Sequence, residues 1–485
     1  MAYFVPAHVG SLHRATRTDM NRANNSFSYA YKTAQNRSEE PIIPDPELFH
    51  FQPPSDSHSA ALKSDLPTVS QCAVHLELLE VFHTLRQKIL QSTELDASFD
   101  ILPHPRTVYR KGYSSAKRKY EISTYTAKDT TFESRREEKW PYFLELAVGR
   151  FVKWIRDVDR MSFWNGSEGA RPGLRLLPPV DVLMVWHAFL LNPTDFDFYC
   201  VKHGLQRMRK ASLPWREIHE AIDSRDWSYN LPKSHKTWLT NQIQLAPDLF
   251  ETLIEINKQD HVKTVLLEFR SGLKQISFSR ERMGTRRNIA FAELVQTTRT
   301  NAKENEPLVE NVQRQTKFIH KMHTYLWIRS PAVEGTVRRA IGRYEKFLQL
   351  FLEYPDSTMV PTLDVDLVWH THLCDPEQYR ASLLQRAGRM VNHDDKLGKS
   401  FLDDRFDKTG ELFRVAFGLQ YHVCLCWDCE AVASAMEAIA KNDDVDILDD
   451  FETEAESVAN KVEEDVRYYR AVEISRQKGM ALPLR

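Results

Sequence analysis

A mainly α-helical fold, with two related helical units and flexible N- and C-terminal segments, is predicted by three features of the sequence. Apolar residues recur at steps of three and four over several long segments, which is the period of an amphipathic helix. Segments with the alternation typical of a β-strand are few, and one motif occurs twice. The helical pattern is found in residues 75–90, 140–158, 247–259, 262–273 and 337–354.

Five consecutive segments are expected along the 485-residue chain, which is long enough for more than one domain. They are a disordered polar tail (1–60), helical unit one (61–235), helical unit two (236–400), a cysteine-containing extension (401–440) and an acidic and mixed-charge C-terminal segment (441–485). The tail is rich in Asn, Ser, Arg and Pro and has no sustained apolar period. Residues 443–465 hold 11 acidic residues against one base, which predicts a solvated helix or tail rather than core.

The nearly equal numbers of basic and acidic residues limit the kinds of partner and the location that we expect. Lys and Arg total 65 and Asp and Glu total 67, so the net charge of -2 gives no overall attraction for nucleic acid phosphates or an anionic membrane. The N-terminus lacks a basic region followed by a long apolar stretch, and no segment approaches the ~20 apolar residues of a membrane span. We therefore expect a cytoplasmic or nuclear protein with neither a membrane nor a nucleic acid partner.

A 16-residue motif occurs twice, at 178–193 and 361–376, and the two copies align without a gap. The identical positions are Pro178/Pro361, Asp181/Asp364, Val182/Val365, Val185/Val368, Trp186/Trp369, His187/His370, Leu190/Leu373 and Pro193/Pro376. So many identities in so short a segment indicate a duplication rather than chance.

A second match precedes each copy of the motif, and it pairs Gly149 with Gly342 and Arg150 with Arg343. Copy one has ten more residues than copy two between this match and the motif, which predicts a surface loop near 161–173. Because the order of the elements is also repeated, residues 147–193 and 340–376 are predicted to fold as equivalent helical hairpins.

Each copy of the motif is predicted to form a helix of about three turns. The shared residues with structural roles are Asp181, Trp186 and His187 in copy one and Asp364, Trp369 and His370 in copy two. The aspartate is placed to cap the first turn, the tryptophan to be a buried anchor and the histidine to bond a nearby polar group. The closing proline is placed to stop the helix.

Copy two carries two polar residues that copy one lacks, because Asp366 and His372 replace Leu183 and Phe189. On a helix, His370 and His372 point roughly 200° apart, which disfavours a single metal ion bound by both. Asp366 and His370 are spaced i,i+4, so they either pair with each other or contribute a carboxylate and an imidazole to one site. The structural pair is the favoured interpretation.

Three cysteines gather at Cys424, Cys426 and Cys429, in a chain whose six cysteines are too sparse for a disulfide scaffold. Cys426 and Cys429 have the spacing found in zinc knuckles, and His422 or His393 is a candidate fourth ligand. The alternative is a tightly packed helix start, which we favour because free cysteines are commonly small buried hydrophobes. No cofactor is expected on balance, with zinc or another divalent metal as the alternative.

The segment DVDLVWHTHLCDPEQY (364–379), with its partner copy, resembles the signature of the glycine-rich domain-containing-protein-like family of fungi and plants. The resemblance covers residues 70–430 and extends to the downstream His393 and to the cysteine segment. The family is described as a domain of unknown function, so the resemblance implies no particular reaction. Plant relatives carry a glycine-rich tail, whereas this chain has 16 glycines, so inferences that depend on that tail do not transfer.

The sequence favours a non-enzymatic interaction protein, a scaffold or regulator with a protein partner, since the common nucleotide, acyl-transfer and zinc-protease motifs are missing. The first alternative is a metal-dependent enzyme, oxygenase- or hydrolase-like, that uses Asp366, His370 and His393, with Asp394 as a further carboxylate. The second alternative is an RNA-binding protein that uses the basic, tyrosine-containing segments 115–120 and 337–344.

Overall fold

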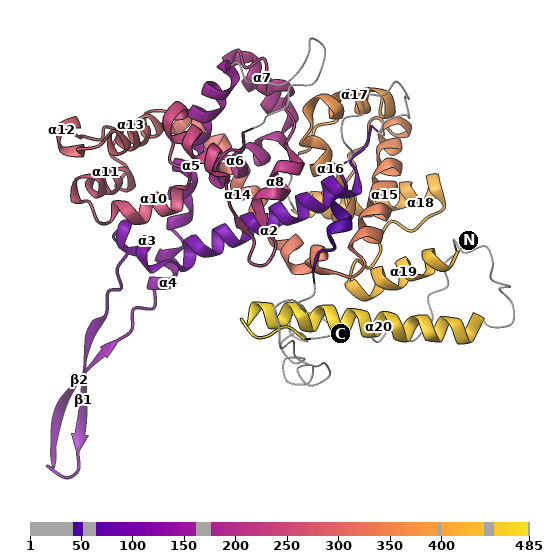
Figure 1. The fold of residues 1–485 in the computed structure, drawn as a ribbon. Helices are drawn as coiled ribbons and strands as arrows, with labels where there is room; N and C mark the ends of the chain where they lie inside the picture. The colour runs from indigo at the N-terminus through magenta and orange to yellow at the C-terminus, as the bar shows by residue number, and fades with distance from the viewer. Residues whose placement is uncertain (1–41, 52–64, 162–175, 395–398, 441–450, 484–485) are drawn as a thin grey trace. The chain divides into compact units, whose positions relative to one another are not determined.

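The computed structural model of the chain describes residues 42–51, 65–161, 176–394, 399–440 and 451–483, which are mainly helical, as the sequence predicts (Figure 1). The chain divides into two compact units, and each unit combines segments that are distant in sequence. This division differs from the predicted consecutive units at 61–235 and 236–400. No helix in the described part of the chain is both long enough and apolar enough to cross a membrane.

Unit 2 comprises Val81–Pro214 and Tyr229–Lys317. Its elements are α3 (Thr93–Ser98), β1 (Arg106–Ser114), β2 (Lys119–Ala127), α4 (Phe132–Arg136), α5 (Lys139–Arg160), α6 (Val180–Leu190), α7 (Pro193–His203), η5 (Met208–Lys210), α9 (Lys233–Trp238), η6 (Leu239–Ile243), α10 (Leu249–Ile256), α11 (Asp260–Arg270), α12 (Arg280–Met283) and α13 (Arg286–Thr300). Helices α2 (Val69–Gln91) and α14 (Ala302–Tyr325) contribute residues to both units.

Unit 1 comprises Met1–Glu80, Trp215–Ser228 and Phe318–Arg485. Its elements are η4 (Pro46–Phe49), α8 (Trp215–Ala221), the two-residue strand β3 (Ile222–Asp223), η7 (Trp327–Arg329), α15 (Val333–Glu353), α16 (Leu363–Leu373), α17 (Pro376–Arg386), α18 (Lys399–Phe417), α19 (Trp427–Ala440) and α20 (Phe451–Gln477). Strand β3 pairs with β4 (Ser228–Tyr229), which lies at the unit boundary.

Both copies of the motif are helices, as predicted, and each has an 11-residue helix at its centre, α6 in unit 2 and α16 in unit 1. Helix α6 packs against α5, and α16 packs against α15. The closing prolines begin the next helices, α7 and α17. The superposition and common origin of the two hairpins stay predictions, and the loop predicted at 161–173 lies almost wholly outside the described residues.

The two motif tryptophans are buried, which confirms this part of the prediction. In unit 2 the ring centre of Trp186 lies 5.4 Å from that of Trp154. In unit 1 the ring of Trp369 lies 5.6 Å from Phe347 and 6.0 Å from Phe351. These contacts join each motif helix to the preceding long helix by apolar burial, which dominates the free energy of folding.

The predicted capping role of the motif aspartates is wrong. The N-cap residues are Pro179 and Thr362, and no side chain caps either helix. Asp181 and Asp364 instead point toward the neighbouring long helix, where they form ion pairs with Arg150 and Arg343. A buried carboxylate without a charged partner costs more free energy than a helix without a side-chain cap. The aspartates therefore form ion pairs and not caps.

Parts of both predicted terminal segments are packed together. Ile43, Tyr468, Val472 and Leu482 form a buried apolar cluster, so one face of helix α20 is covered. This differs from the predicted polar tail (1–60) and from the predicted solvated C-terminal segment. Residues 1–41, 52–60, 441–450 and 484–485 of these two segments lie outside the described part of the chain.

An antiparallel hairpin in unit 2, formed by β1 and β2, is not anticipated by the sequence analysis. Its side chains are exposed on both faces, so the strands lack the alternation between apolar and polar residues that marks a half-buried strand. Without this alternation, the basic segment 115–120 does not indicate a turn between two strands, so the hairpin is not predicted.

Candidate metal site

Three side chains that can bind a metal ion converge in unit 1. Helix α16 provides Asp366 and His370, one turn apart, and the segment that follows α17 provides His393. The Nε2 atoms of His370 and His393 are 3.0 Å apart. Asp366 Oδ1 lies 3.3 Å from the first of these nitrogens and 3.4 Å from the second.

These distances fit ligands that share one small cation. A triangle with sides of 3.0, 3.3 and 3.4 Å has its centre about 1.9 Å from each corner, close to the Zn–N and Zn–O distances of about 2.0–2.2 Å. A cation slightly outside the plane of the three atoms would therefore be within bonding distance of all of them. Two imidazoles and one carboxylate are also the ligand set of facial-triad metal sites.

The environment of Asp366 Oδ1 gives independent support for a cation at this place. Asp366 Oδ1 is buried and receives no hydrogen bond of acceptable geometry from the described residues, although it lies near both imidazole nitrogens. A buried carboxylate oxygen without a hydrogen bond is costly, because its hydration is lost without replacement. A cation between the three ligands would remove this cost.

Aromatic rings and hydrogen bonds fix the two imidazoles. The ring of Phe318 lies 4.2 Å from that of His370, and the ring of Trp369 packs edge-on at 5.0 Å from that of His393. Trp369 Nε1 donates to the Tyr379 hydroxyl (3.0 Å), and this hydroxyl donates to the Val391 carbonyl (2.6 Å). The second bond holds the chain two residues before His393.

A cavity of about 300 Å³ reaches one of the three candidate ligands, His393. His393 and Trp369 contribute to its wall, together with Phe351, Met359 and Arg389. Asp394, the predicted further carboxylate, also lines the cavity but does not belong to the group of three ligands. The cavity is large enough for a small organic molecule beside a bound cation.

His372 does not belong to this group, because it lies on another side of the helix, as the sequence predicts. Its Nδ1 is 3.0 Å from the hydroxyl of Tyr344, and the side chain is buried. Burial lowers the pKa of His372 to about 3, so the imidazole is neutral at pH 7. The structure therefore does not bring His372, also a candidate metal ligand in the sequence, together with Asp366 and His370.

Unit 2 provides the contrast. There Leu183 replaces the carboxylate, and the buried His187 packs against Phe82 with ring centres 5.5 Å apart. Burial lowers the pKa of His187 to about 3. Among the described residues, copy one therefore lacks the ligand group that Asp366 makes possible in copy two.

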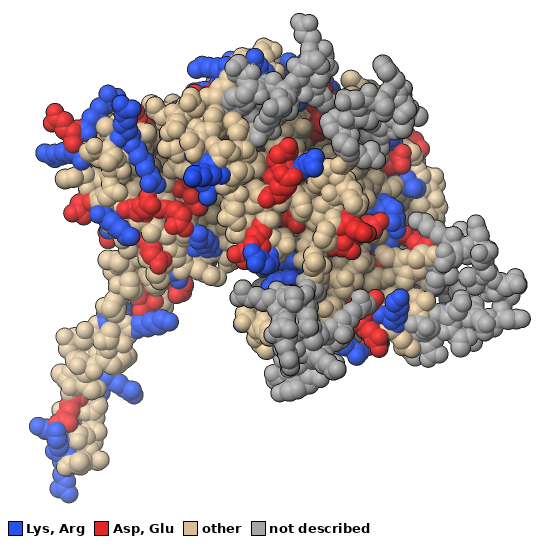
Figure 2. All heavy atoms as spheres, viewed as in Figure 1, with Lys and Arg blue, Asp and Glu red and all other residues tan. Residues whose placement is uncertain are grey.

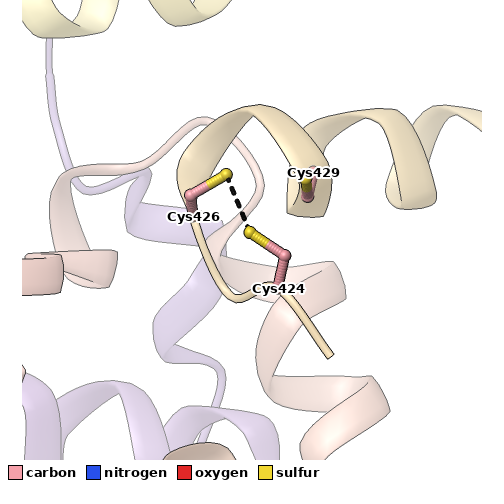
Figure 3. A group of neighbouring side chains, drawn as sticks. All are labelled: Cys424, Cys426 and Cys429. Carbon is pink, nitrogen blue, oxygen red and sulfur yellow. Dashed lines mark hydrogen bonds between the residues drawn. The ribbon is translucent and has the colours of Figure 1, made fainter. Parts of the chain in front are cut away.

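The cysteines form a second group of potential ligands, Cys424, Cys426 and Cys429 (Figure 3). Neither predicted fourth ligand belongs to this group. His393 is part of the group with Asp366, and the ring of His422 packs edge-on at 4.5 Å from Phe406. The sequence thus identifies the candidate ligand residues of both groups, but it names His393 as a candidate in both groups and does not decide between them.

Comparisons with known proteins agree with the resemblance noted in the sequence. Residues 246–381 match the model of the family described as "Glycine-rich domain-containing protein-like". The chain is 33% identical over 301 residues to Glycine-rich domain-containing protein 1 of Arabidopsis thaliana, a match that covers 58% of this chain and 30% of the relative. It is 31% identical over 125 residues to Glycine-rich domain-containing protein 2 of the same plant, covering 24% and 15%.

The chain therefore spans less than a third of the length of either relative. No solved structure shows a significant match. The segment that matches the family includes Asp366 and His370 and ends before His393.

Proposed function

Residues 246–381 resemble the glycine-rich domain-containing protein-like family, and from the geometry of Asp366, His370 and His393 we propose that this chain is a metal-dependent enzyme. The observation that carries the proposal is the convergence of three ligand atoms within 3.4 Å of one another, with the carboxylate oxygen buried and lacking a hydrogen bond. A structural Asp–His pair, which the sequence favours, needs only two of these three residues.

The chemistry follows from the open coordination positions. Three protein ligands leave a divalent cation free to bind water or substrate, and a metal-bound water loses its proton near neutral pH far more easily than bulk water. The adjacent cavity of about 300 Å³ would admit a small molecule, with Arg389 as a cationic group in the wall. The reaction class is hydrolytic if the resident ion is zinc and oxidative if it is iron.

The test is the metal content of the full chain. Asp366→Asn keeps the shape of the side chain but weakens it as a ligand, and His393→Gln removes an imidazole. We expect each variant to bind one metal ion fewer per chain than the wild type, measured by elemental analysis after gel filtration. His261→Gln, which changes an exposed histidine, is the matched control and should retain the wild-type content.

The proposal fails if the wild type and Asp366→Asn bind the same amount of metal. It also fails if the wild-type chain takes up no ion at this site after incubation with zinc, manganese or iron(II) under anaerobic conditions. Far-ultraviolet circular dichroism of each variant separates loss of a ligand from loss of the fold.

A second candidate function, a non-enzymatic interaction protein, is favoured by the hairpin of β1 and β2. The register places Tyr109, Lys111, Tyr113, Tyr120 and Ile122 on one face, and the tyrosines and the isoleucine are all more than half exposed. Residues 106–127 contain six basic residues and one acidic residue. Figure 2 shows Lys and Arg side chains along this hairpin.

This surface fits an acidic, extended segment of a partner protein. Exposed tyrosines are common anchors in protein interfaces, and the basic residues would favour a negatively charged partner. The outer edges of the two strands carry backbone groups to which an extended segment can hydrogen-bond, since the sheet contains only these two strands.

Fluorescence anisotropy with a labelled peptide of alternating glutamate and leucine tests this second function. We expect Tyr109→Ser/Tyr113→Ser/Tyr120→Ser to weaken binding by more than about tenfold, because the aromatic anchors are lost. Tyr229→Phe, a change at a half-buried tyrosine outside the hairpin, is the control. Binding of single-stranded poly(U) in preference to the peptide would contradict this function and support the RNA alternative.

A further inference from the structure

A second cluster of ligand side chains lies just before helix α19 in unit 1. The sulfur atoms of Cys424 and Cys426 are 3.4 Å apart, and those of all three cysteines lie within 4.8 Å of one another. Figure 3 shows Cys424 and Cys426 pointing toward each other, with Cys429 on the first turn of the helix. Cys424 is exposed and the other two are half-buried, so the cluster is accessible from solvent.

The remaining cysteines give the contrast. Cys72, Cys200 and Cys374 are buried and belong to no group of metal ligands among the described residues. Their environment is that of small apolar side chains in a core, which is the common role of a free cysteine. The predicted packed helix start accounts for Trp427, which is buried, but not for three thiols that face one another at the surface.

The loop that carries the cluster is held on both sides. Trp327 Nε1 donates to the Leu425 carbonyl (2.9 Å), and Trp427 Nε1 donates to the Tyr325 carbonyl (2.6 Å). The backbone amide of Cys429 also donates to the sulfur of Cys426. Bonds of this kind fix the positions of the sulfurs before any ligand arrives and so reduce the entropic cost of binding it.

Ion pairs hold the first turn of α19 as well. Arg339 Nη2 lies 2.5 Å from Glu430, and Arg470 Nη2 lies 2.5 Å from Asp428. Both carboxylates are thereby paired with arginines, and neither belongs to the group of the three thiols. The cluster therefore offers sulfur as its ligand type, which selects a soft or borderline cation rather than magnesium or calcium.

We propose that Cys424, Cys426 and Cys429 bind one zinc ion through three thiolates, with a water molecule or another exchangeable ligand in the fourth position. Three sulfurs bound tetrahedrally at about 2.3 Å are about 3.8 Å apart, a separation between the 3.4 Å from Cys424 Sγ to Cys426 Sγ and the limit of 4.8 Å for all three sulfurs. Zinc displaces the three thiol protons to solvent, and no group is oxidised or reduced. The site is separate from that of Asp366.

The experiment uses the full reduced chain and cobalt(II) as a spectroscopic probe for zinc. We expect one equivalent of cobalt to produce the near-ultraviolet sulfur-to-metal absorption and the visible bands of tetrahedral coordination, and one equivalent of zinc to abolish them. Each of Cys424→Ser, Cys426→Ser and Cys429→Ser should weaken zinc binding by more than about 100-fold, because loss of a ligand exceeds the effect of losing a supporting contact.

Two control variants separate this site from other ligands. His422→Ala, which lies two residues from Cys424, should leave the cobalt spectrum unchanged, and Asp366→Asn should leave its near-ultraviolet sulfur-to-metal absorption unchanged. Alkylation of the wild type by iodoacetamide gives a readout that does not depend on the folding of any variant. Zinc should protect these three cysteines from modification, as located by mass spectrometry.

The proposal is overturned if cobalt gives no sulfur absorption with the reduced wild-type chain. Equal alkylation of the three cysteines with and without zinc would overturn it as well. Binding of as many zinc ions per chain by the triple Cys→Ser variant as by the wild type would have the same consequence.

Discussion

The Nε2 atoms of His370 and His393 lie 3.0 Å apart, although the two residues are separated by 23 positions and by the whole of helix α17. Two imidazole nitrogens at this distance compete for one proton or share one cation. Because Asp366 Oδ1 is also within 3.4 Å of both, a cation satisfies all three atoms at once, whereas one proton does not.

The bond from the Tyr379 hydroxyl to the Val391 carbonyl should position His393. Tyr379→Phe removes this bond without changing the size of the ring, so we expect the affinity for metal at the Asp366 site to fall by about tenfold, as for other supporting contacts. Competition with a chromophoric chelator measures the affinity. Tyr109→Phe on the exposed hairpin is the control.

Tyr379 acts on the metal site through the position of His393, so the stability of the metal-free chain must also be measured. An equal loss of affinity in Tyr379→Phe and Tyr109→Phe would contradict the assignment. So would a loss of affinity that merely follows a lower unfolding midpoint of the metal-free protein.

The paired glycines of the repeated segments should respond in opposite ways to alanine. A Cβ atom at Gly149 would lie 1.9 Å from Thr298 Oγ1 on helix α13, whereas one at Gly342 meets nothing within 4 Å. We expect Gly149→Ala to destabilise the protein by about 1–3 kcal/mol through overpacking. Gly342→Ala should be neutral or stabilising by up to about 1 kcal/mol, because alanine favours the helix.

Urea unfolding of the two glycine variants measures the difference directly. Equal effects of Gly149→Ala and Gly342→Ala would show that α13 does not approach α5 as closely as the structure indicates.

The two Arg–Asp pairs should differ in strength because they differ in exposure. Arg150 and Asp181 are almost completely buried, whereas the side chain of Arg343 is 15% exposed. Arg150→Met leaves a buried carboxylate without its cation and should cost about 3–5 kcal/mol of the free energy of unfolding. Arg343→Met, whose partner is Asp364, should cost less because water can reach that pair.

The double variant Arg150→Met/Asp181→Leu tests the cause of this loss. It should be more stable than Arg150→Met alone, since neither charge remains buried. A double variant as unstable as the sum of its single variants would show that the arginine acts through packing and not through its charge.

The buried histidines predict a loss of stability in mild acid. Burial lowers the pKa of His187 and of His372 to about 3, against about 6.5 in the unfolded chain. The unfolded chain therefore binds protons that the folded chain does not as the pH falls from about 6.5 toward 3. Stability contributed by the neutral imidazoles is fully present above pH 6.5 and decreases through this window.

Unfolding free energies measured between pH 6.5 and 4.5 test this prediction. His187→Gln should make the dependence shallower by about 1.4 kcal/mol per pH unit, the linkage for one proton. His261→Gln, at an exposed position, is the control. An unchanged slope in His187→Gln would contradict the burial of His187 as a neutral side chain.

Much of the helical architecture can be predicted from the sequence, because an apolar period of three and four residues and the bounding prolines act locally. The local pattern predicts Asp364 as a helix cap, and this prediction fails because Asp364 pairs with Arg343 on another helix. Each copy does contain both members of the ion pair, Arg150 with Asp181 and Arg343 with Asp364. This joint recurrence is the feature of the sequence from which the ion pairs could be predicted. The hairpin at 106–127 was missed because neither of its faces is buried.

The candidate metal site was predictable only in part. The i,i+4 spacing of Asp366 and His370 places them on one stripe of a helix, and it excludes His372 from that stripe. The approach of His393 depends on the path of the chain after α17 and on its contacts with Tyr379, which no local pattern encodes. The choice between a structural pair and a metal site therefore requires the tertiary structure.

X-ray absorption spectroscopy of the metal bound by the Cys424→Ser/Cys426→Ser/Cys429→Ser chain tests the central claim most directly, because this variant lacks the thiol cluster. We predict one ion per chain with only nitrogen and oxygen ligands at about 2.0–2.2 Å, and outer-shell scattering from two imidazole rings. The signal should disappear when Asp366→Asn is added. An absence of bound metal, or a spectrum that Asp366→Asn leaves unchanged, would contradict a metal centre formed by Asp366, His370 and His393.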